Sequence, residues 1–391
     1  MIAFTPTGAV TASSGGILEA VKGQFGEGTD YEPLDDFLRV SLTIYRDPED
    51  TQGYYRISIA AGTQAGNLEV MPKEIILMID ASLSIQRKRL AAFKRGIDDI
   101  LHQLNPGDRF NLFAFKENVT FFAPQSIPAA EDSIQQALQF LDHLRAGQRT
   151  DLYQAFLDSL QQEALLLPSY ILLFSDGKPN TGITSQERII TEVTQVNGQQ
   201  RSIFTLSGGE RVNRFLLDFM AYQNRGWAQY AKTELEIPQK IRDLYGKIKN
   251  PILLNLRYQL NALNEAEIYP KHLPDFYRDT AFVLYGVFDQ EKEFSMRLLG
   301  EALENTETSS SSESGGHDES PGTRRFKTVE FIFSRDLSQA SLGDRDIARH
   351  WALNKVYHLI SEMTQEGYKA EKLEEIRKLT RKFDLQTPYL F

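Results

Sequence analysis

The stretch that decides the fold of this chain is Ile75-Ile-Leu-Met-Ile-Asp-Ala-Ser-Leu-Ser84. Its first five residues form an unbroken apolar run, which is typical of a strand covered on both faces of a parallel sheet. Asp80, Ser82 and Ser84 follow the run directly, with an oxygen-bearing side chain at every second position. The stretch therefore predicts a central strand that delivers three polar side chains to the carboxyl edge of an α/β sheet, where such sheets bind their ligands.

The chain on either side of this strand alternates between short apolar runs and amphipathic segments. Further strands are predicted at residues 110–115, 170–174, 202–206 and 227–231. Helices are predicted at residues 90–104, 134–144, 152–167, 187–196, 214–222 and 237–248. Strands that alternate with helices predict an α/β domain with a doubly wound, mainly parallel sheet over residues 71–250.

The segments that flank this domain have a different pattern. Alternating apolar runs predict strands at 37–45 and 54–60 and again, after Pro251, at 252–260, 281–288, 294–299 and 328–333. We expect residues 37–70 and 251–340 to form one discontinuous antiparallel β-sandwich, into which the α/β domain is inserted. Composition predicts a loosely ordered arm at 1–36 and a disordered loop at 301–325, and apolar stripes predict C-terminal helices over 341–391.

Composition excludes several classes of function. The chain has 391 residues, a net charge of −10 and no cysteine, so disulfides, zinc–thiolate sites and thiol catalysis are excluded. An acidic protein repels phosphate backbones, so we expect no nucleic-acid partner. The sequence as given contains no signal peptide and no membrane-spanning run. We therefore expect no membrane insertion and a cytoplasmic location by default, unless the sequence is part of a longer protein; the oligomeric state is not predicted.

Three predicted loops bring oxygen donors to one edge of the sheet. The strand at 170–174 delivers Asp176 there, and Thr150 lies in the loop before the helix at 152. The candidate metal ligands are Asp80, Ser82, Ser84, Thr150 and Asp176. Carboxylates and hydroxyls suit Mg²⁺, or alternatively Mn²⁺ or Ca²⁺. Two carboxylates roughly neutralise such a dication, which leaves it able to bind an Asp or Glu carboxylate offered by a protein partner.

Each candidate residue also has an ordinary structural role open to it. Asp80 and Thr150 can cap helices, and Ser82 and Ser84 can be loop hydroxyls. A phosphatase of the haloacid dehalogenase type needs a second Asp where this chain has Ser82. The chain also lacks a Gly-x-x-x-x-Gly-Lys loop, a Gly-x-Ser-x-Gly elbow and a His-Glu-x-x-His motif. We therefore expect a protein that is not an enzyme, with a metal-dependent hydrolase as a minor alternative.

The spacing of Asp80-x-Ser82-x-Ser84, together with Thr150 and Asp176, resembles the metal-ion-dependent adhesion site of von Willebrand factor type A domains. The resemblance covers about residues 71–249. It implies that Ser82, Ser84 and Thr150 bind the metal, and that Asp80 and Asp176 bind it directly or through water. Two positions depart from the family pattern: Leu83 stands where many members have Gly, and Ile85 where Met is common.

The rest of the chain resembles the inter-alpha-trypsin inhibitor heavy chains and their bacterial relatives. The segments that carry this resemblance are residues 201–209, 225–229, 244–252, 267–275, 348–352 and 387–389. It implies an interaction module and not an inhibitor. Together with the charge of the predicted site, this leads us to expect a non-enzymatic module that captures a carboxylate of a protein partner through its metal. The alternative is an intracellular scaffold or assembly factor that docks through the sandwich or the C-terminal helices, possibly beside an ATPase.

Overall fold

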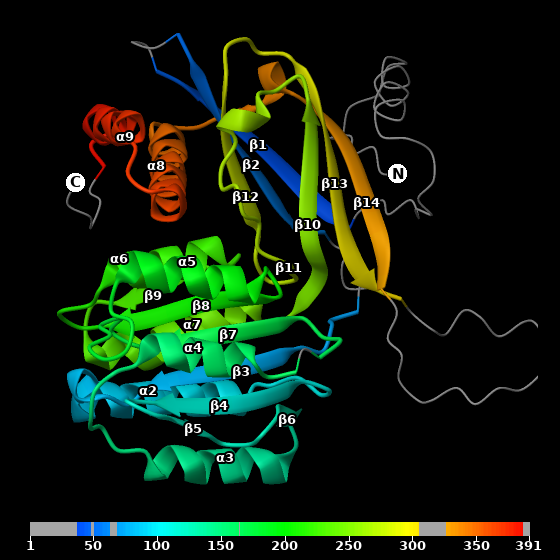
Figure 1. The fold of residues 1–391 in the computed structure, drawn as a ribbon. Helices are drawn as coiled ribbons and strands as arrows, with labels where there is room; N and C mark the ends of the chain where they lie inside the picture. The colour runs from blue at the N-terminus through cyan, green and yellow to red at the C-terminus, as the bar shows by residue number, and fades with distance from the viewer. Residues whose placement is uncertain (1–36, 48–50, 63–68, 164, 305–325, 386–391) are drawn as a thin grey trace, which may run out of the picture. The chain divides into compact units, whose positions relative to one another are not determined.

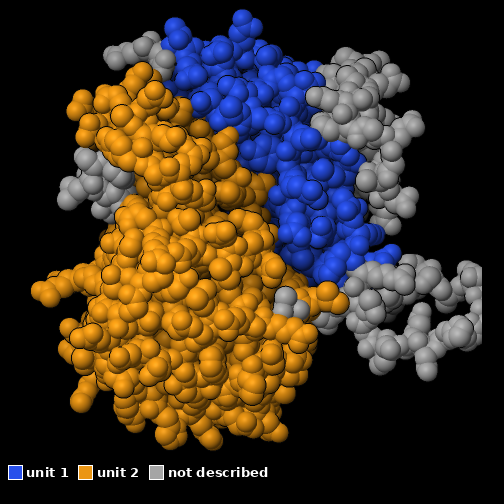
Figure 2. Space-filling view, viewed as in Figure 1, with its two compact units in different colours: residues 1–71, 251–268, 275–348 blue, residues 72–250, 269–274, 349–391 orange. Residues whose placement is uncertain are grey.

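The computed structural model of the protein describes residues 37–47, 51–62, 69–163, 165–304 and 326–385 (Figure 1). The chain divides into two compact units (Figure 2). Unit 1 comprises residues up to 71, 251–268 and 275–348, and unit 2 comprises 72–250, 269–274 and 349 onward. The predicted arm at 1–36, most of the predicted loop at 301–325 and the resemblance at 387–389 lie outside the described residues.

Unit 2 contains one mixed sheet with the strand order β5-β4-β3-β7-β8-β9, and β6 pairs with β4. The strands are β3 (Glu74–Asp80), β4 (Arg109–Phe115), β5 (Val119–Phe121), β6 (Ile127–Pro128), β7 (Ser169–Phe174), β8 (Arg201–Gly208) and β9 (Ala228–Ala231). Pairing is parallel from β4 to β9, whereas β5 and β6 run antiparallel to β4. Every residue of β3 and β7 is buried, which explains the unbroken apolar runs.

Six α-helices of the described chain lie between these strands or directly after the last of them. They are α2 (Gln86–Leu101), α3 (Glu131–His143), α4 (Leu152–Leu160), α5 (Gln186–Asn197), α6 (Arg214–Gln223) and α7 (Ile237–Ile248). The helix α2 packs beside α7, and α5 lies next to both α4 and α6 (Figure 1). The predicted α/β architecture of this segment is thus confirmed, with antiparallel edge strands that the sequence analysis did not anticipate.

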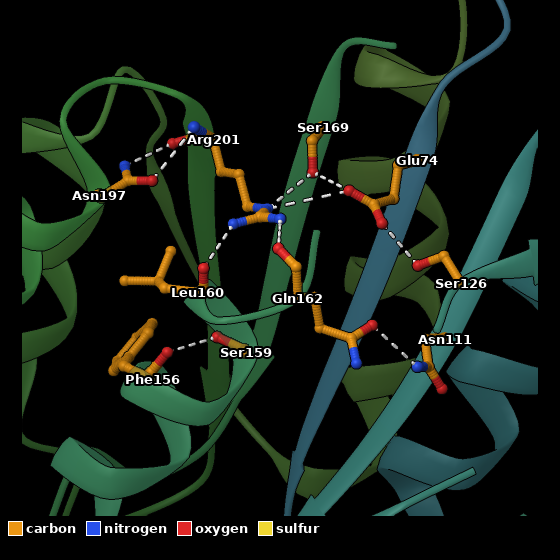
Figure 3. A network of polar contacts seen from close by, with 10 residues as sticks. All are labelled: Glu74, Asn111, Ser126, Phe156, Ser159, Leu160, Gln162, Ser169, Asn197 and Arg201. Atoms are coloured by element: carbon orange, nitrogen blue, oxygen red, sulfur yellow. Dashed lines mark hydrogen bonds and ion pairs between the residues drawn. The ribbon is translucent and has the colours of Figure 1, made fainter. Parts of the chain in front are cut away.

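A buried polar network ties the amino ends of three neighbouring strands together (Figure 3). Glu74 of β3, Ser169 of β7 and Arg201 of β8 are successive partners in the pairing register. The Ser169 hydroxyl donates to Glu74 Oε2 over 2.5 Å, and Arg201 Nε donates to Ser169 Oγ over 3.2 Å. Ser126 donates to the other oxygen of Glu74 over 2.6 Å. Both oxygens of this buried carboxylate therefore accept a hydrogen bond.

The same arginine ends a helix earlier than the sequence predicts. Apolar spacing predicted a helix over 152–167, but α4 ends at Leu160. The guanidinium of Arg201 donates to the carbonyl of Leu160 over 3.2 Å and to that of Gln162 over 2.8 Å. Because helix-terminal carbonyls need partners from outside the helix, a buried donor at this place stabilises the chain's exit from α4.

The first helix after β3 is also displaced from its predicted range of 90–104. The structure begins α2 at Gln86 and ends it at Leu101. The next residues turn into a fixed loop, in which the Asn105 N–H donates to Asp108 Oδ2 over 2.7 Å and the Lys73 ammonium binds the same oxygen at 2.5 Å. Lys73 and Asp108 are both fully buried, so each charge has the other as its partner away from the surface.

Unit 1 contains two four-stranded sheets with the orders β12-β2-β1-β15 and β11-β10-β13-β14. The strands are β1 (Leu38–Arg46), β2 (Gly53–Ala61), β10 (Pro251–Asn261), β11 (Phe276–Tyr277), β12 (Phe282–Phe288), β13 (Glu293–Leu303), β14 (Phe326–Asp336) and β15 (Ser341–Leu342). The strand β2, which precedes the α/β segment, pairs along its length with β12, which follows it. Ring contacts join the two sheets, between Tyr55 and Phe294 and between Phe276 and Phe282.

The predicted loop at 301–325 begins too early. The strand β13 continues through Leu303, which pairs with Phe326 at the start of β14. Alternation supports the extension, because Ala302 is buried while Glu301 and Leu303 are half-buried. Residues 305–325 lie outside the described part of the chain.

Two helices close the described chain, α8 (Asp346–Glu366) and α9 (Ala370–Lys382). Within unit 2, Asp218 of α6 accepts hydrogen bonds from two tyrosines, Tyr230 of β9 over 2.6 Å and Tyr357 of α8 over 3.1 Å. This carboxylate therefore fastens α8 to the α/β domain. No helix in the described ranges has the length and apolar character needed to cross a membrane.

The pairing of β2 with β12 generates a prediction about fragments of the chain. A fragment consisting of residues 251–391 lacks both β1 and β2, so β12 loses its hydrogen-bonded neighbour. We expect this fragment to show no cooperative thermal transition by circular dichroism, while the whole chain melts cooperatively. A sharp, reversible transition in the isolated fragment would contradict the pairing.

Candidate metal site

Asp80 ends β3 and lies at the base of the predicted site with no exposed surface. One of its oxygens accepts from the Ser82 N–H over 2.9 Å, and the other accepts from the Ser175 hydroxyl over 2.6 Å. Ser175 follows β7, the parallel neighbour of β3, so the sheet register itself brings the two loops together. Asp80 is thus oriented by hydrogen bonds, and no lysine or arginine side chain of the described residues is paired with it.

The second and third predicted ligands lie in the turn that leads from β3 into α2. The Ser82 and Ser84 hydroxyl oxygens lie 3.1 Å apart. Ser84 also hydrogen-bonds the carboxylate of Asp176. Ser82 is fully buried, whereas Ser84 is half-buried. The structure therefore joins Asp80, Ser82, Ser84 and Asp176 in one continuous set of oxygen atoms.

The loop that bears Thr150 is attached to the same turn through its backbone. Leu83 N–H donates to the carbonyl of Gln148 over 3.1 Å, and Gly147 N–H donates to that of Ala81 over 2.9 Å. The Thr150 N–H donates to Asn180 Oδ1 over 2.8 Å, in the loop that follows Asp176. Thr150 therefore sits between the two loops that carry the predicted carboxylates.

The residues present fit a divalent cation, and Thr150 provides the test. Its Oγ1 is buried and has no hydrogen-bond partner among the described residues. Burying a hydroxyl without a partner costs about 1–3 kcal/mol, so such an atom is expected to have a ligand. The described chain brings together no set of three or more His, Cys, Asp or Glu side chains that could hold a metal. The predicted site would not form one, because only two of its five ligands are carboxylates.

Burial raises the pKa of both carboxylates of the site. It raises the pKa of Asp80 to about 6, against the opposing effect of the hydrogen bonds from Ser175 and Ser82. Burial also raises the pKa of Asp176, although Ser84 and the charge of Arg89 act in the other direction. A cation placed among these oxygens would supply the missing positive charge.

Sequence reasoning missed two residues of this site. Arg89 of α2 is buried, with its Nη1 atom 3.7 Å from Asp176 Oδ2, and it donates to the carbonyl of Glu210 over 2.8 Å. The prediction that α2 begins at Leu90 left this residue outside the helix. Ser175, whose hydroxyl donates to Asp80, was not among the predicted site residues.

The fold and the position of these loops identify the class of domain. The family model of the von Willebrand factor type A domain matches residues 73–230, and this chain carries such a domain. Domains of this class are in general protein-interaction modules. They commonly bind a divalent metal at an adhesion site.

The curated relatives of the chain include inter-alpha-trypsin inhibitor heavy chains. Heavy chain 4 of Mus musculus is 25% identical over 335 residues, which cover 82% of this chain and 34% of the relative. Heavy chain H1 of Homo sapiens is 24% identical over 59% of this chain and 26% of its own length. The resemblance predicted from the sequence is thus confirmed, and the chain spans about a third of the length of the first relative.

Solved structures support the fold. A von Willebrand factor type A protein from Catenulispora acidiphila aligns with 92% of this chain and 89% of its own at a TM-score of 0.53 and 13% identity. The ArnB paralog VWA2 from Sulfolobus acidocaldarius aligns with 88% of this chain and 89% of its own at a TM-score of 0.50 and 15% identity. At these identities the likeness concerns the fold alone.

The buried charge of Asp80 generates a prediction about stability without metal. In excess chelator near pH 7.5, Asp80→Asn should raise the free energy of unfolding, because the amide keeps the bond from Ser82 and removes a buried charge. The folded state holds the Asp80 proton up to a pH of about 6, and the unfolded chain only up to its ordinary value of 3.8. The contribution of Asp80 to the free energy of unfolding therefore falls as the pH rises between these values. The Asp80→Asn protein should accordingly be the more stable of the two above pH 6.

Glu74→Gln is the matched control, because Glu74 lies at the other end of the same strand and both its oxygens are hydrogen-bonded. This variant should lower stability in chelator. Urea unfolding of both variants at several pH values measures the difference, and a destabilised Asp80→Asn protein would contradict the description of its environment.

The unpartnered hydroxyl of Thr150 generates a second prediction. Thr150→Val keeps the approximate volume and removes the unpartnered oxygen, so in chelator the variant should be at least as stable as the wild type, by up to about 1–3 kcal/mol. With Mg²⁺ at a hundredfold excess over its Kd, the wild type should gain about 2.7 kcal/mol, and the variant clearly less. Ser202→Ala removes another buried, unpartnered hydroxyl, from β8, and should leave the Mg²⁺ increment unchanged. Equal increments in Thr150→Val and wild type would reject Thr150 as a ligand.

Proposed function

We propose that this chain is a non-enzymatic binding module that captures a carboxylate of a protein partner through a divalent metal, held by Asp80, Ser82, Ser84, Thr150 and Asp176. The buried and unpartnered Thr150 Oγ1, beside two buried carboxylates, is the observation that carries the proposal. Mg²⁺ fits this set best, and Mn²⁺ or Ca²⁺ would accept the same oxygens. When bound, the metal supplies an electrophilic centre for an anionic ligand.

The residues around the proposed metal have separate roles in this function. Ser175 and the Ser82 N–H hold the Asp80 carboxylate in place from β7 and from the following turn. Arg89 faces Asp176 from the side of α2 and limits the negative charge that the site presents. The partner's carboxylate would approach past Ser84, the half-buried member of the set.

The type A domain supports a role in protein interaction, and its relatives are typically non-enzymatic. We also infer that the two sheets of unit 1 form a single sandwich that is discontinuous in sequence. The ring contact between Tyr55 and Phe294 and the pairing of β2 with β12 support this arrangement.

Binding experiments separate capture at the metal from docking elsewhere. For any purified partner, affinity should fall at least tenfold on chelation, on Asp80→Ala and on replacing the one captured Asp or Glu by its amide, since losing one partner of a charged contact commonly costs about 2–5 kcal/mol. Thr150→Ala should weaken binding as well, because it removes one of the ligands. Isothermal titration calorimetry with and without Mg²⁺ measures each value.

The scaffold alternative predicts the opposite pattern. A partner that docks on the sheets of unit 1 or on the C-terminal helices would bind both site variants as tightly as the wild type. It would lose affinity only when residues 341–391 are removed or when the unit 1 surface is changed. That result, with no effect of chelator, would reject capture at the metal.

A further inference from the structure

The loops around the proposed metal site expose one large apolar side chain. Leu83 lies between Ser82 and Ser84 and is 69% exposed, although Asp80 and Ser82 are fully buried. Its backbone is fixed, because its N–H is bonded to Gln148. The side chain therefore projects into solvent from a turn whose backbone is hydrogen-bonded to the loop that bears Thr150. A single exposed leucine is ordinary on protein surfaces, so Leu83 is informative only together with the charged side chains of the neighbouring loops.

The charge of the same loops differs from the charge of the chain as a whole. The chain carries a net charge of −10. The loops at the carboxyl edge of β4, β7 and β8 and the loop before α4 nevertheless carry five basic side chains that are exposed or half-buried, namely Lys116, Arg145, Arg149, Lys178 and Arg211. Arg145 is engaged with the carbonyls of Asp142 and Leu144 next to α3, and the other four make up the basic rim of these loops. The acidic side chains in these loops, apart from the ligand Asp176, are Glu117, Asp151 and Glu210, and Asp151 is engaged in capping α4.

Two of these basic residues lie close to proposed ligands along the chain. Arg149 precedes Thr150, and Lys178 follows Asp176 by two residues. Arg211 lies in the loop whose Glu210 carbonyl accepts a hydrogen bond from Arg89, the arginine beside Asp176. A basic rim on an acidic molecule attracts acidic ligands to this edge and repels basic ones.

We propose that the segment bound at this edge is an acidic stretch of a protein in which an aliphatic residue is adjacent to the captured Asp or Glu. The aliphatic side chain would cover Leu83, and the flanking acidic residues would face the basic rim of Lys116, Arg149, Lys178 and Arg211. This inference rests on the proposed function, since it takes the metal as the anchor. It adds the chemistry of the residues on either side of that anchor.

Short peptides test the recognition directly, with the whole chain as the receptor. Four fluorescein-labelled peptides share their length and differ at the centre, which is Glu-Asp-Leu-Glu, Glu-Asp-Ser-Glu, Gln-Asp-Leu-Gln or Gln-Asn-Leu-Gln. Fluorescence anisotropy in Mg²⁺ at low salt should rank the first peptide tightest. The second and third should each bind about fivefold to tenfold more weakly, and the fourth should not bind. The advantage of the Glu flanks should shrink at high salt, while the advantage of Leu persists.

Matched receptor variants assign each preference to its residues. Leu83→Ser should remove the preference for Leu over Ser and keep metal-dependent binding. Leu166→Ser changes a side chain that is 73% exposed before β7, at the amino edge of the sheet, and should change nothing. Arg149→Ser with Arg211→Ser should reduce the preference for Glu flanks, whereas Arg188→Ser, on α5, should not.

The outcomes separate this inference from the proposed function. Equal Mg²⁺-dependent binding of the three Asp peptides would overturn the recognition of flanking residues and leave metal-dependent capture intact. Tighter binding to the peptide with neutral flanks would overturn the role of the basic rim. If Mg²⁺ raises the melting temperature but none of the peptides binds, capture of a carboxylate segment is wrong, and this inference fails with it. If Mg²⁺ has no effect on melting, the metal site itself is wrong.

Discussion

The parallel pairing of β3 with β7 and of β7 with β8 fixes both edges of the central sheet at once. Glu74, Ser169 and Arg201 are register partners at the amino edge, where hydrogen bonds connect them. Counted from that edge, the same register carries β3 to Asp80 and β7 to the loop that begins with Ser175. A slip of one residue in either pairing would separate Asp80 from the Ser175 hydroxyl, so the site depends on a register that is locked at its opposite end.

The two ends of β3 show two different solutions to the burial of a carboxylate. At the amino end, each oxygen of Glu74 accepts a hydroxyl bond and a guanidinium lies 3.8 Å away. At the carboxyl end, Asp80 accepts two hydrogen bonds and has a second carboxylate, Asp176, as an electrostatic neighbour. Burial therefore raises the pKa of Asp80, and a neighbouring hydroxyl on Thr150 has no partner among the described residues. The arrangement around Glu74 stabilises the fold. The arrangement around Asp80 leaves two carboxylates and a hydroxyl that a dication would neutralise and bind.

How much of this could be predicted from the sequence depended on the range of the interactions. The Asp-x-Ser-x-Ser string was recognisable because strand and ligands are adjacent in the chain, and Asp176 because a second buried strand precedes it directly. The true end of α4 was not predictable from its own residues, since the donor to the carbonyl of Leu160 is Arg201, far along the chain. Arg89 was missed for a related reason, because a charged residue near the start of an amphipathic helix is normally exposed, and only the tertiary structure buries it against Asp176.

We propose that one divalent cation binds among the oxygens of Asp80, Ser82, Ser84, Thr150 and Asp176. Crystals of the whole chain grown with Mn²⁺ and measured at the manganese absorption edge would locate the ion by its anomalous scattering. The account predicts one strong peak within about 2.0–2.4 Å of the hydroxyl oxygens of Ser82, Ser84 and Thr150. The same peak should be absent from crystals of the Asp80→Asn protein. Manganese bound elsewhere, or no peak between β3 and β7 in the wild-type protein, would contradict it.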